Sequence, residues 1–406
     1  MSELQKPRPR NPVRALRRPT LPPGGRSRAA LRLTAAAAEG RFELQHCFEC
    51  ATVQYPPRAV CVNCLSHRLE WREVSGAGDL IAATVLHHSN ELYYRERVPL
   101  RLGTVKLDAG PVALAHLHRD CAAPSRVTVR AHLDKSGQAV LIALPEDPMD
   151  RNDSMLREMT SDPKFRNVLI TDGKSAVGQA LAKALVEAGA GIVWLGIAEP
   201  WKQGAATPDL PQTERVPLDL TDEKSVRDLA GVIGGKVDIL INTAELHRTH
   251  TIADRGTETA RAEMDVNYLG LMRLAQAFGP AMRARAAEGT GATAWVNLLS
   301  IYALSALPSH GTFSASKAAA FALSQTLRSD MRHAGIRVVN VFPGPIDDEW
   351  NQLVPPPKLG AAALAKAIVA ALHDGVEDVY PGDVAQDVMT SFRESQKVLE
   401  RELWDQ

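Results

Sequence analysis

The sequence has no long apolar run, no excess of either charge and few cysteines. No stretch approaches the ~18 apolar residues that a helix needs to span a bilayer, so we expect a soluble, cytoplasmic protein. Its 406 residues carry 47 basic and 47 acidic side chains, so the net charge gives no support for a nucleic-acid partner. A chain of this length is sufficient for two domains.

Acidic residues are also absent between Glu3 and Glu39, where nine Lys and Arg side chains lie among prolines. A segment of this composition buries too little apolar surface to fold, so residues 1–25 are predicted to be a disordered basic tail. An Arg-rich, acid-poor start is also typical of a transit peptide, which stays an alternative. The Ala/Leu-rich residues 26–39 are predicted to form one helix that ends at Gly40.

Of the five cysteines, four lie within eighteen residues as two C-x2-C pairs: Cys47, Cys50, Cys61 and Cys64. Each pair places two thiolates on one side of a tight knuckle, and two knuckles complete a tetrahedral sulfur site for one zinc ion. Four protein ligands leave no position for water, so the predicted zinc is structural. Free thiols or an iron centre are the alternatives. Cys121 stands apart and is predicted to be a small core residue.

Residues 75–144 contain about five short stretches in which apolar and polar residues alternate between turn residues. This pattern predicts a small closed antiparallel barrel. The stretches lack the aromatic platform with interleaved cations that single-stranded nucleic acid needs. The cysteine pairs, Tyr55-Pro56-Pro57 between them and Val74-Ser75-Gly76 at the start of the barrel resemble the rubredoxin-like zinc-ribbon/OB-fold family of acyl-CoA metabolism. The resemblance covers residues 26–145; it implies a barrel that holds the CoA end of an acyl-CoA and a thiolase- or aldolase-like partner enzyme.

The remaining chain is predicted to form a linker and a second domain. Residues 146–165 are polar, charged and interrupted by proline, which is typical of a linker. From residue 166 to residue 406, short buried strands alternate with helical patterns. This alternation predicts an α/β, doubly wound, Rossmann-type parallel sheet with helices on both faces.

The segment between Ser300 and Lys317 carries the chemistry of this domain. Ser300, Lys317 and Asn267 have the spacing of the catalytic Ser, Lys and Asn of the short-chain dehydrogenase/reductase family, which residues 166–406 resemble. The resemblance implies a tyrosine four residues before the lysine, but that position is Phe313. A phenol donates a proton because a neighbouring ammonium lowers its pKa, whereas a phenyl ring has no proton to give. The matching residues are therefore interpreted mainly as remnants that hold loop and helix geometry.

The cofactor positions of that family are only partly kept. Those that match are Thr171, Gly178, Asp219, Asn242, Lys317 and Gly344. Those that depart from the pattern are Asp172 and Ala176 in the glycine-rich first turn, Glu245 beside the nicotinamide, and Asp348 where a threonine would bind the carboxamide. Carboxylates at these places would crowd and repel a dinucleotide, so binding of NAD(P) is doubtful.

The sequence is compatible with three functions. The first is an acyl-CoA-metabolism protein whose reductase-like domain is redox-impaired and acts as a scaffold and dimerisation platform. The second is an active NAD(P)-dependent reductase of a CoA-linked or polycyclic ketone that uses a relocated acid such as Tyr302 or His310. The third is a protein that senses a dinucleotide or an acyl-CoA without turnover. A homodimer follows from the family resemblance, through helix residues Ala320, Leu323, Leu327 and Met331.

Overall fold

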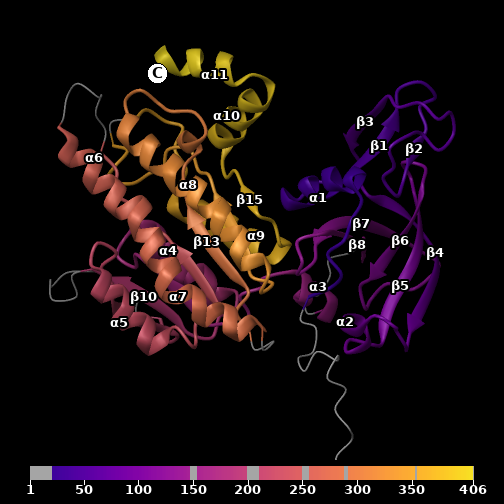
Figure 1. The fold of residues 1–406 in the computed structure, drawn as a ribbon, viewed down its shortest axis with the longest axis horizontal. Helices are drawn as coiled ribbons and strands as arrows, with labels where there is room; N and C mark the ends of the chain where they lie inside the picture. The colour runs from indigo at the N-terminus through magenta and orange to yellow at the C-terminus, as the bar shows by residue number, and fades with distance from the viewer. Residues whose placement is uncertain are drawn as a thin grey trace, which may run out of the picture.

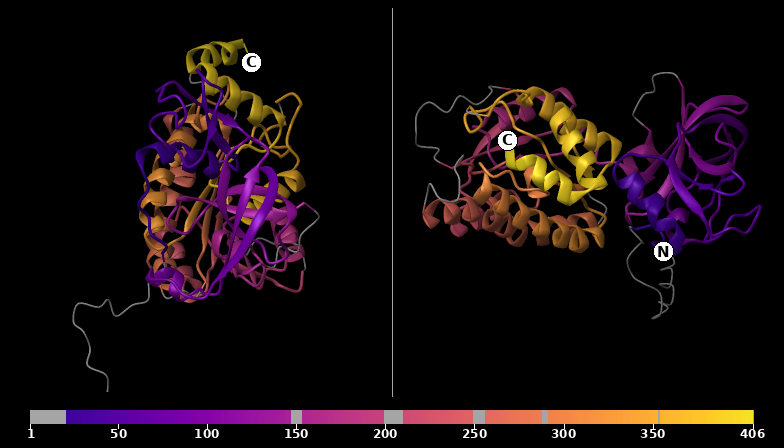
Figure 2. Two further views of the ribbon diagram at one scale, coloured as in Figure 1. Left: turned by 90° about the vertical axis from the view of Figure 1, so that its right-hand side faces the viewer. Right: turned by 90° about the horizontal axis from the view of Figure 1, so that it is seen from above.

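The computed structural model describes residues 21–146, 153–198, 210–248, 256–287, 291–352 and 354–405. They form an N-terminal body and a C-terminal body that lie side by side (Figures 1 and 2). Residues 1–20 of the predicted tail lie outside this description, as do residues 147–152 of the predicted linker. The described end of the linker contains helix α3 (Ser154–Met159), which Asp153 caps by accepting hydrogen bonds from the backbone N–H groups of Met155 and Leu156.

The N-terminal helix is shorter than predicted. A 3-10 turn, η1 (Arg28–Ala30), leads into α1 (Leu31–Ala38), and the chain leaves the helix through Gly40 at φ +76°. Glycine adopts this left-handed conformation without strain, which is why the helix ends here.

A three-stranded antiparallel ribbon follows, with β1 (Glu43–Cys47) between β2 (Val53–Gln54) and β3 (Leu69–Glu73). The next five strands close into a barrel in the order β4-β5-β6-β8-β7. Their bounds are β4 (Ala77–Leu86), β5 (Leu100–Leu107), β6 (Val112–Leu117), β7 (Ser125–Leu133) and β8 (Ala139–Pro145), with the short helix α2 (Leu92–Arg95) between β4 and β5. The predicted closed barrel is confirmed, although β6 and β8 pair in parallel.

The barrel core is continuous with the ribbon and the first helix. Alternate residues of the strands point inward, and Leu44 of β1 and Leu33 of α1 pack into the same cluster. Cys121 is 2 % exposed in this cluster, which confirms its prediction as a core residue. The ribbon therefore shares its apolar core with the barrel.

The C-terminal body is a doubly wound parallel sheet, as predicted. Its seven strands have the order β11-β10-β9-β12-β13-β14-β15, and each neighbouring pair is parallel. In chain order they are β9 (Val168–Ile170), β10 (Val193–Ile197), β11 (Thr213–Pro217), β12 (Ile239–Asn242), β13 (Ala294–Leu298), β14 (Arg337–Val341) and β15 (Asp378–Val379).

Helices cover both faces of this sheet. One face packs against α4 (Ala176–Glu187) and α9 (Ala361–Asp374), and the other against α5 (Glu223–Ile233), α7 (Gly270–Ala287) and α8 (Gly311–Arg332). Helix α6 (Thr257–Met264) continues into α7 through a π-helical turn, η2 (Asp265–Leu269). The chain closes with α10 (Asp383–Glu394), α11 (Gln396–Glu402) and η4 (Leu403–Asp405). The central strands are mostly apolar because helices bury both of their faces, and the exceptions include the buried Asn242, Asn297 and Asn340.

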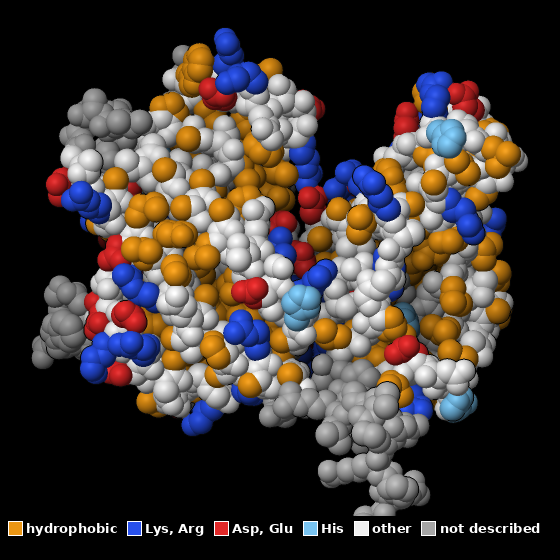
Figure 3. Space-filling view, viewed as in Figure 1, with side chains coloured by type: hydrophobic (Ala, Val, Ile, Leu, Met, Phe, Trp, Pro, Cys, Tyr) orange, Lys and Arg blue, Asp and Glu red, His pale blue; other side chains and the backbone are white. Residues whose placement is uncertain are grey.

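The two bodies touch through specific polar contacts. The backbone N–H of Glu377 donates to the carbonyl of Ala38 at 2.7 Å, and the Arg337 guanidinium donates to the carbonyl of Leu133 at 2.9 Å. Nδ1 of His132 lies 3.1 Å from the carbonyl oxygen of Asp374. Above these contacts, a notch separates the ribbon from the C-terminal helices (Figure 3).

The helices bear on two predictions, one about a membrane span and one about a dimer interface. Among the described residues, no helix has the length and apolar character needed to cross a membrane. The prediction of a dimer interface on α8 was partly wrong, because Ala320, Leu327 and Met331 lie in the core of their own domain. Leu323 is partly buried against the same core.

Candidate functional site

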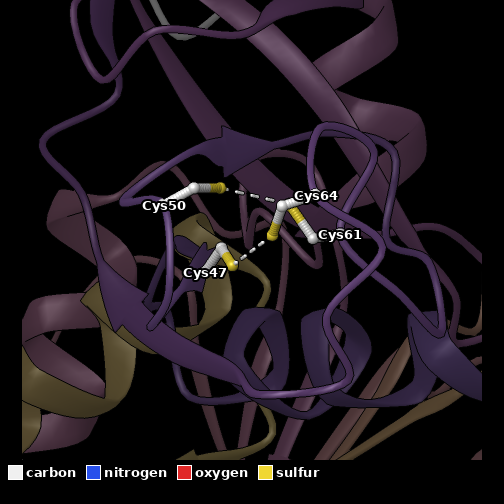
Figure 4. Close-up of side chains that lie close together, drawn as sticks. All are labelled: Cys47, Cys50, Cys61 and Cys64. Atoms are coloured by element: carbon white, nitrogen blue, oxygen red, sulfur yellow. Dashed lines mark hydrogen bonds between the residues drawn. The ribbon is translucent and has the colours of Figure 1, made fainter.

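The four paired cysteines meet at one end of the ribbon (Figure 4). Their sulfur atoms all lie within 4.8 Å of one another, with 3.5 Å between the Cys47 and Cys64 sulfurs and 3.6 Å between those of Cys50 and Cys61. Four thiolates converging at this spacing can surround one tetrahedral zinc ion. The predicted ligands are therefore brought together, although Cys47 and Cys64 come from opposite ends of the motif.

The first strand-to-helix turn of the Rossmann domain is closed by a carboxylate. Oδ1 of Asp172 accepts hydrogen bonds from the backbone N–H groups of Lys174 at 3.0 Å and Ser175 at 3.3 Å. Backbone N–H groups at this turn are the donors that cradle a phosphate in dinucleotide-binding folds. In this chain an internal anion already accepts from them. Burial raises the pKa of Asp172, and the neighbouring charge of Glu245 adds to the rise.

Gly178 is required by packing in this turn. A Cβ atom on Gly178 would lie 1.9 Å from the carbonyl oxygen of Asp172. The third glycine of the motif therefore keeps its structural purpose, the close approach of helix to turn.

Thr171 and Asn242 tie the two central strands together at the point where the strand order reverses. The Thr171 hydroxyl donates to Oδ1 of Asn242 at 2.9 Å and accepts from the backbone N–H groups of Thr243 and Ala244. Ligands of open α/β sheets bind beside this reversal, at the carboxyl ends of the strands. The fixed geometry of this edge is therefore intact.

A cavity of about 630 Å³ opens at this edge. Thr171 and Asp219 of the predicted cofactor residues line it, whereas Gly344 does not and instead lies against Val384 of α10. Among the described residues that line the cavity, the acidic ones are Asp172, Asp219, Glu245, Asp348 and Glu349, and the only basic one is Lys174. The cavity has the size of a small-molecule site but an excess of negative charge.

Asp219 and Asp348 both accept hydrogen bonds from their own loops. Oδ1 of Asp219 accepts from the Thr221 hydroxyl at 2.7 Å, and Oδ1 of Asp348 accepts from the side-chain amide of Asn351 at 3.0 Å. Burial raises the pKa of Asp348, and the charge of Glu245 contributes to the rise. At the position where a threonine would offer a donor to a carboxamide, the chain has an acceptor that is already occupied.

Lys317 is the charged centre of the catalytic segment. It is 2 % exposed, and its Nζ lies 2.8 Å from Oε2 of Glu245 and donates to the carbonyl of Leu298 at 3.0 Å. A buried ammonium needs such a counter-ion, because burial without one disfavours its charged form. The sequence predicted that Glu245 would crowd the cofactor, but it did not predict this ion pair.

Phe313 fills the position of the missing tyrosine as an apolar core residue. Its ring stacks on His247 with 3.9 Å between ring centroids, and it lies 5.4 Å from Nζ of Lys317. The ring of His310 lies next to that of His247, with 4.7 Å between ring centroids. Burial raises the pKa of the nearby Tyr302 to about 12, which makes this phenol a weaker acid. The pair of imidazoles at Phe313 could not be foreseen from spacing, because His247 belongs to the loop after β12.

Ser300 and Asn267 make structural contacts. The Ser300 hydroxyl accepts from the backbone N–H of Tyr302 at 3.2 Å and caps the 3-10 turn η3 (Ile301–Ala303). Asn267 lies in the π-helical turn, where its amide donates to the Leu246 carbonyl at 2.9 Å and to the Ser316 hydroxyl at 2.8 Å. These contacts join the loop after β12 to helix α8 and hold the segment in place.

Comparison with known proteins divides the chain in the same way. Residues 34–70 match the family model described as the rubredoxin-like zinc ribbon domain of ChsH2, and residues 71–134 match that of the C-terminal OB-fold domain of ChsH2. Residues 166–357 match the short chain dehydrogenase model.

The C-terminal domain also has relatives that align over nearly their whole length. An uncharacterized oxidoreductase of Staphylococcus haemolyticus is 31% identical over 226 residues, which are 53% of this chain and 95% of that protein. A short chain dehydrogenase of Burkholderia cenocepacia, solved in complex with NADP, is 34% identical with a TM-score of 0.55 and covers 60% of this chain and 98% of its own. A short-chain dehydrogenase of Streptomyces avermitilis is 25% identical, with a TM-score of 0.51 and coverages of 60% and 97%.

These matches bear on the earlier doubt about the cofactor, because a relative at 34% identity holds NADP in its structure. The comparisons thus do not support that doubt, which rests on this chain's own substitutions. The ribbon match and the converging sulfurs support one zinc ion. The chain belongs to the short-chain dehydrogenase family, whose Rossmann domain it carries behind a zinc ribbon and an OB-fold of the ChsH2 type.

Proposed function

We propose that this protein is an acyl-CoA-metabolism factor in which the short-chain dehydrogenase domain is redox-impaired and acts as a scaffold. The observation that carries the proposal is the contact between Lys317 and Glu245, 2.8 Å apart beside the ring of Phe313. In the family pattern this lysine serves the cofactor and the catalytic tyrosine. In this chain its charge is compensated from within, and the tyrosine is absent.

Proton supply is the first difficulty for hydride transfer. A general acid contributes about 10²–10⁴-fold in rate, and it must lie within hydrogen-bond reach of the substrate oxygen. Phe313 has no proton to give, and Tyr302 has a pKa raised to about 12. Neither Phe313 nor Tyr302 would therefore readily protonate an alkoxide formed in this cleft.

Charge is the second difficulty. A dinucleotide brings a pyrophosphate to the first turn, where the Asp172 carboxylate accepts from the donors at Lys174 and Ser175. Glu245 and Asp348 add further negative charge around the same cavity. Like charges at close range disfavour binding, so we expect affinity for NAD(P) to be weak.

For the N-terminal module we propose binding of an acyl-CoA in the barrel and a thiolase- or aldolase-like partner enzyme. The support is the match to the ChsH2-type ribbon and OB-fold. We further propose a homodimer and a cytoplasmic location, where reducing conditions keep four thiols available for zinc.

Restoring the residues of the family pattern tests the proposal that the short-chain dehydrogenase domain is redox-impaired. In the purified protein, NADPH followed by fluorescence should show no saturable binding in the micromolar range. Glu245→Gly should free Lys317 and raise NADPH affinity at least about tenfold, a change of about 1.4 kcal/mol. Reduction of a panel of CoA-linked and polycyclic ketones should require the further change Phe313→Tyr.

Glu349→Gln is the matched control, because it removes one charge from the same cavity without touching Lys317. An equal gain in NADPH affinity in this control would show that the overall charge of the cavity, and not the release of Lys317, causes the effect. Micromolar NADPH binding by the unaltered protein, followed by reduction of a ketone, would refute the scaffold proposal.

An active NADP-dependent reductase is the second candidate. It is favoured by the NADP-bound relative at 34% identity and by the cavity of about 630 Å³ that persists at the sheet edge. Saturable NADPH binding without ketone reduction would instead favour a dinucleotide sensor.

A further inference from the structure

A second cavity, of about 350 Å³, lies where the two bodies meet. The Rossmann segments that line it precede strands β9, β13 and β14, so it lies at the amino end of the sheet, opposite the nucleotide cleft. Its charged lining comes from three parts of the chain: Lys135 from the β7–β8 turn of the barrel, Arg157 and Glu158 from α3, and Arg166 from the entry to β9.

Positive charge exceeds negative charge in this lining. Glu158 is the only acid among the described lining residues, and it already has three partners: the Tyr93 hydroxyl at 2.7 Å, Nε of Arg97 at 3.0 Å and Nζ of Lys135 at 3.2 Å. Its charge is thus compensated without the two arginines of the cavity.

The hydrogen-bond partners of the two arginines are neutral within the described part of the chain. Arg166 donates to the Thr293 hydroxyl at 2.6 Å, and Arg157 donates to the Lys164 carbonyl at 3.3 Å. The nearby Asp238 carboxylate is taken by Arg285 at 2.7 Å and by the backbone N–H of Asn167 at 2.8 Å. Burial, followed by the charge of Arg157, lowers the pKa of Arg166 to about 10, although the charges of Asp162, Asp238 and Glu158 oppose this shift.

Arg157 and Arg166 are half-buried, and a guanidinium in such a place is costly without a hydrogen-bonded anion, more so when a second cation lies beside it. The planar guanidinium fork matches the oxygens of a phosphate, and burial strengthens such charge-assisted hydrogen bonds. A volume of about 350 Å³ is at the lower end of small-molecule sites, which span about 300–1,000 Å³. It therefore accommodates a phosphate together with part of the group that the phosphate esterifies.

We propose that the cavity lined by Lys135, Arg157 and Arg166 binds a phosphate group, either free or as part of a phosphate ester, and thereby bridges the two bodies. This site is independent of hydride transfer and of the nucleotide cleft. Because its cations come from the barrel, the linker helix and the Rossmann domain, an occupant stabilises their association by mass action.

Thermal unfolding of the full-length protein provides the first test. Sodium phosphate at millimolar concentration should raise the unfolding midpoint by several degrees above the effect of sodium chloride at equal ionic strength. Arg166→Gln should abolish this phosphate-specific rise. Arg157→Gln should weaken it, and this variant keeps the test valid if the Arg166 variant folds poorly. Arg227→Gln, an exposed change on α5, should respond to phosphate like the unaltered protein.

Titration calorimetry with inorganic phosphate, CoA and 3′-dephospho-CoA then distinguishes the sources of the phosphate. Binding of phosphate itself that is lost in the Arg166 variant supports a free-anion site. Binding of CoA alone, lost in the same variant and weakened for 3′-dephospho-CoA, supports an ester site. The proposal is overturned if phosphate and chloride shift the midpoint equally and CoA binding is unchanged in both arginine variants.

Discussion

At the scale of single residues, the catalytic positions of the family make structural contacts in this chain. Lys317, Asn267 and Ser300 are present, but their contacts are an internal ion pair, a link between the loop after β12 and helix α8, and a turn cap. The identity of a residue could be read from the sequence, whereas its partner could not. Glu245 compensates the charge of Lys317, and the two residues lie far apart in the sequence.

Gly178 offers a test of backbone packing at this scale. Gly178→Ala would place a methyl group 1.9 Å from the Asp172 carbonyl, so the turn must move. We expect a loss of about 1–3 kcal/mol or more in the free energy of unfolding, measured by urea denaturation.

Gly231→Ala is the matched control for this change. Gly231 is exposed in α5, and a Cβ there meets nothing within 4 Å. Because alanine favours helix, this variant should gain about 0.5–1 kcal/mol. Equal effects of the two substitutions would contradict the packing argument.

At the scale of elements, the ribbon depends on its metal and the barrel depends on the ribbon. The ribbon has only three short strands, two of five residues and one of two. Phe42 and Leu44 beside the cysteine knuckles belong to the barrel core. Loss of zinc should therefore loosen both elements and leave the Rossmann sheet intact.

Metal analysis and hydrogen exchange check this prediction. The purified protein should contain one zinc per chain, and a chelator should raise exchange in β1–β3 and in the neighbouring barrel strands. Structural zinc contributes about 10–16 kcal/mol in small fingers, which exceeds what so small a sheet supplies by itself. Cys61→Ser should lose the metal, whereas Cys121→Ala should retain it. Less than half an equivalent of zinc in the unaltered protein would count against the site.

At the scale of the whole molecule, His132 reports on the junction of the two bodies. It lies on β7, and its Nδ1 contacts the carbonyl of Asp374, the last residue of α9. Burial, followed by the charges of Arg337 and Arg130, lowers the pKa of His132 to about 4. The ring is therefore neutral in the folded protein at pH values where it would be protonated in the unfolded chain.

The sign of the pH effect follows from this shift. Between about pH 6.5 and pH 4 the unfolded chain binds the proton and the folded protein does not, so acidification lowers stability. The loss attributable to His132 should reach about 3 kcal/mol below pH 4, given the pKa change from 6.5 to about 4.

His132→Asn removes the titration but keeps a donor for the Asp374 carbonyl. Its free energy of unfolding should fall less steeply with acidification than that of the unaltered protein over this pH window. The exposed His67→Asn variant should keep the original slope. If the His132 variant follows the unaltered protein at every pH, the buried neutral histidine is not the cause.

The sequence by itself determined the fold classes and the local chemistry. Two C-x2-C pairs fix a metal site because the ligands of each pair are neighbours, and alternation of strands and helices fixes a parallel sheet because each period reflects which faces are buried. The absence of a tyrosine at Phe313 is likewise a local fact. The parallel pairing of β6 with β8 was missed, since it depends on contacts between distant segments, and the first helix begins later than predicted.

Only the tertiary structure decided how charges pair. The Lys317–Glu245 contact and the stacking of His247 on Phe313 join the loop after β12 to helix α8. These two segments are distant in the sequence. Lys135, Arg157 and Arg166 also meet only because the two bodies pack together. Burial strengthens the electrostatic interactions between these side chains because it removes them from water. Burial exists only in the folded molecule.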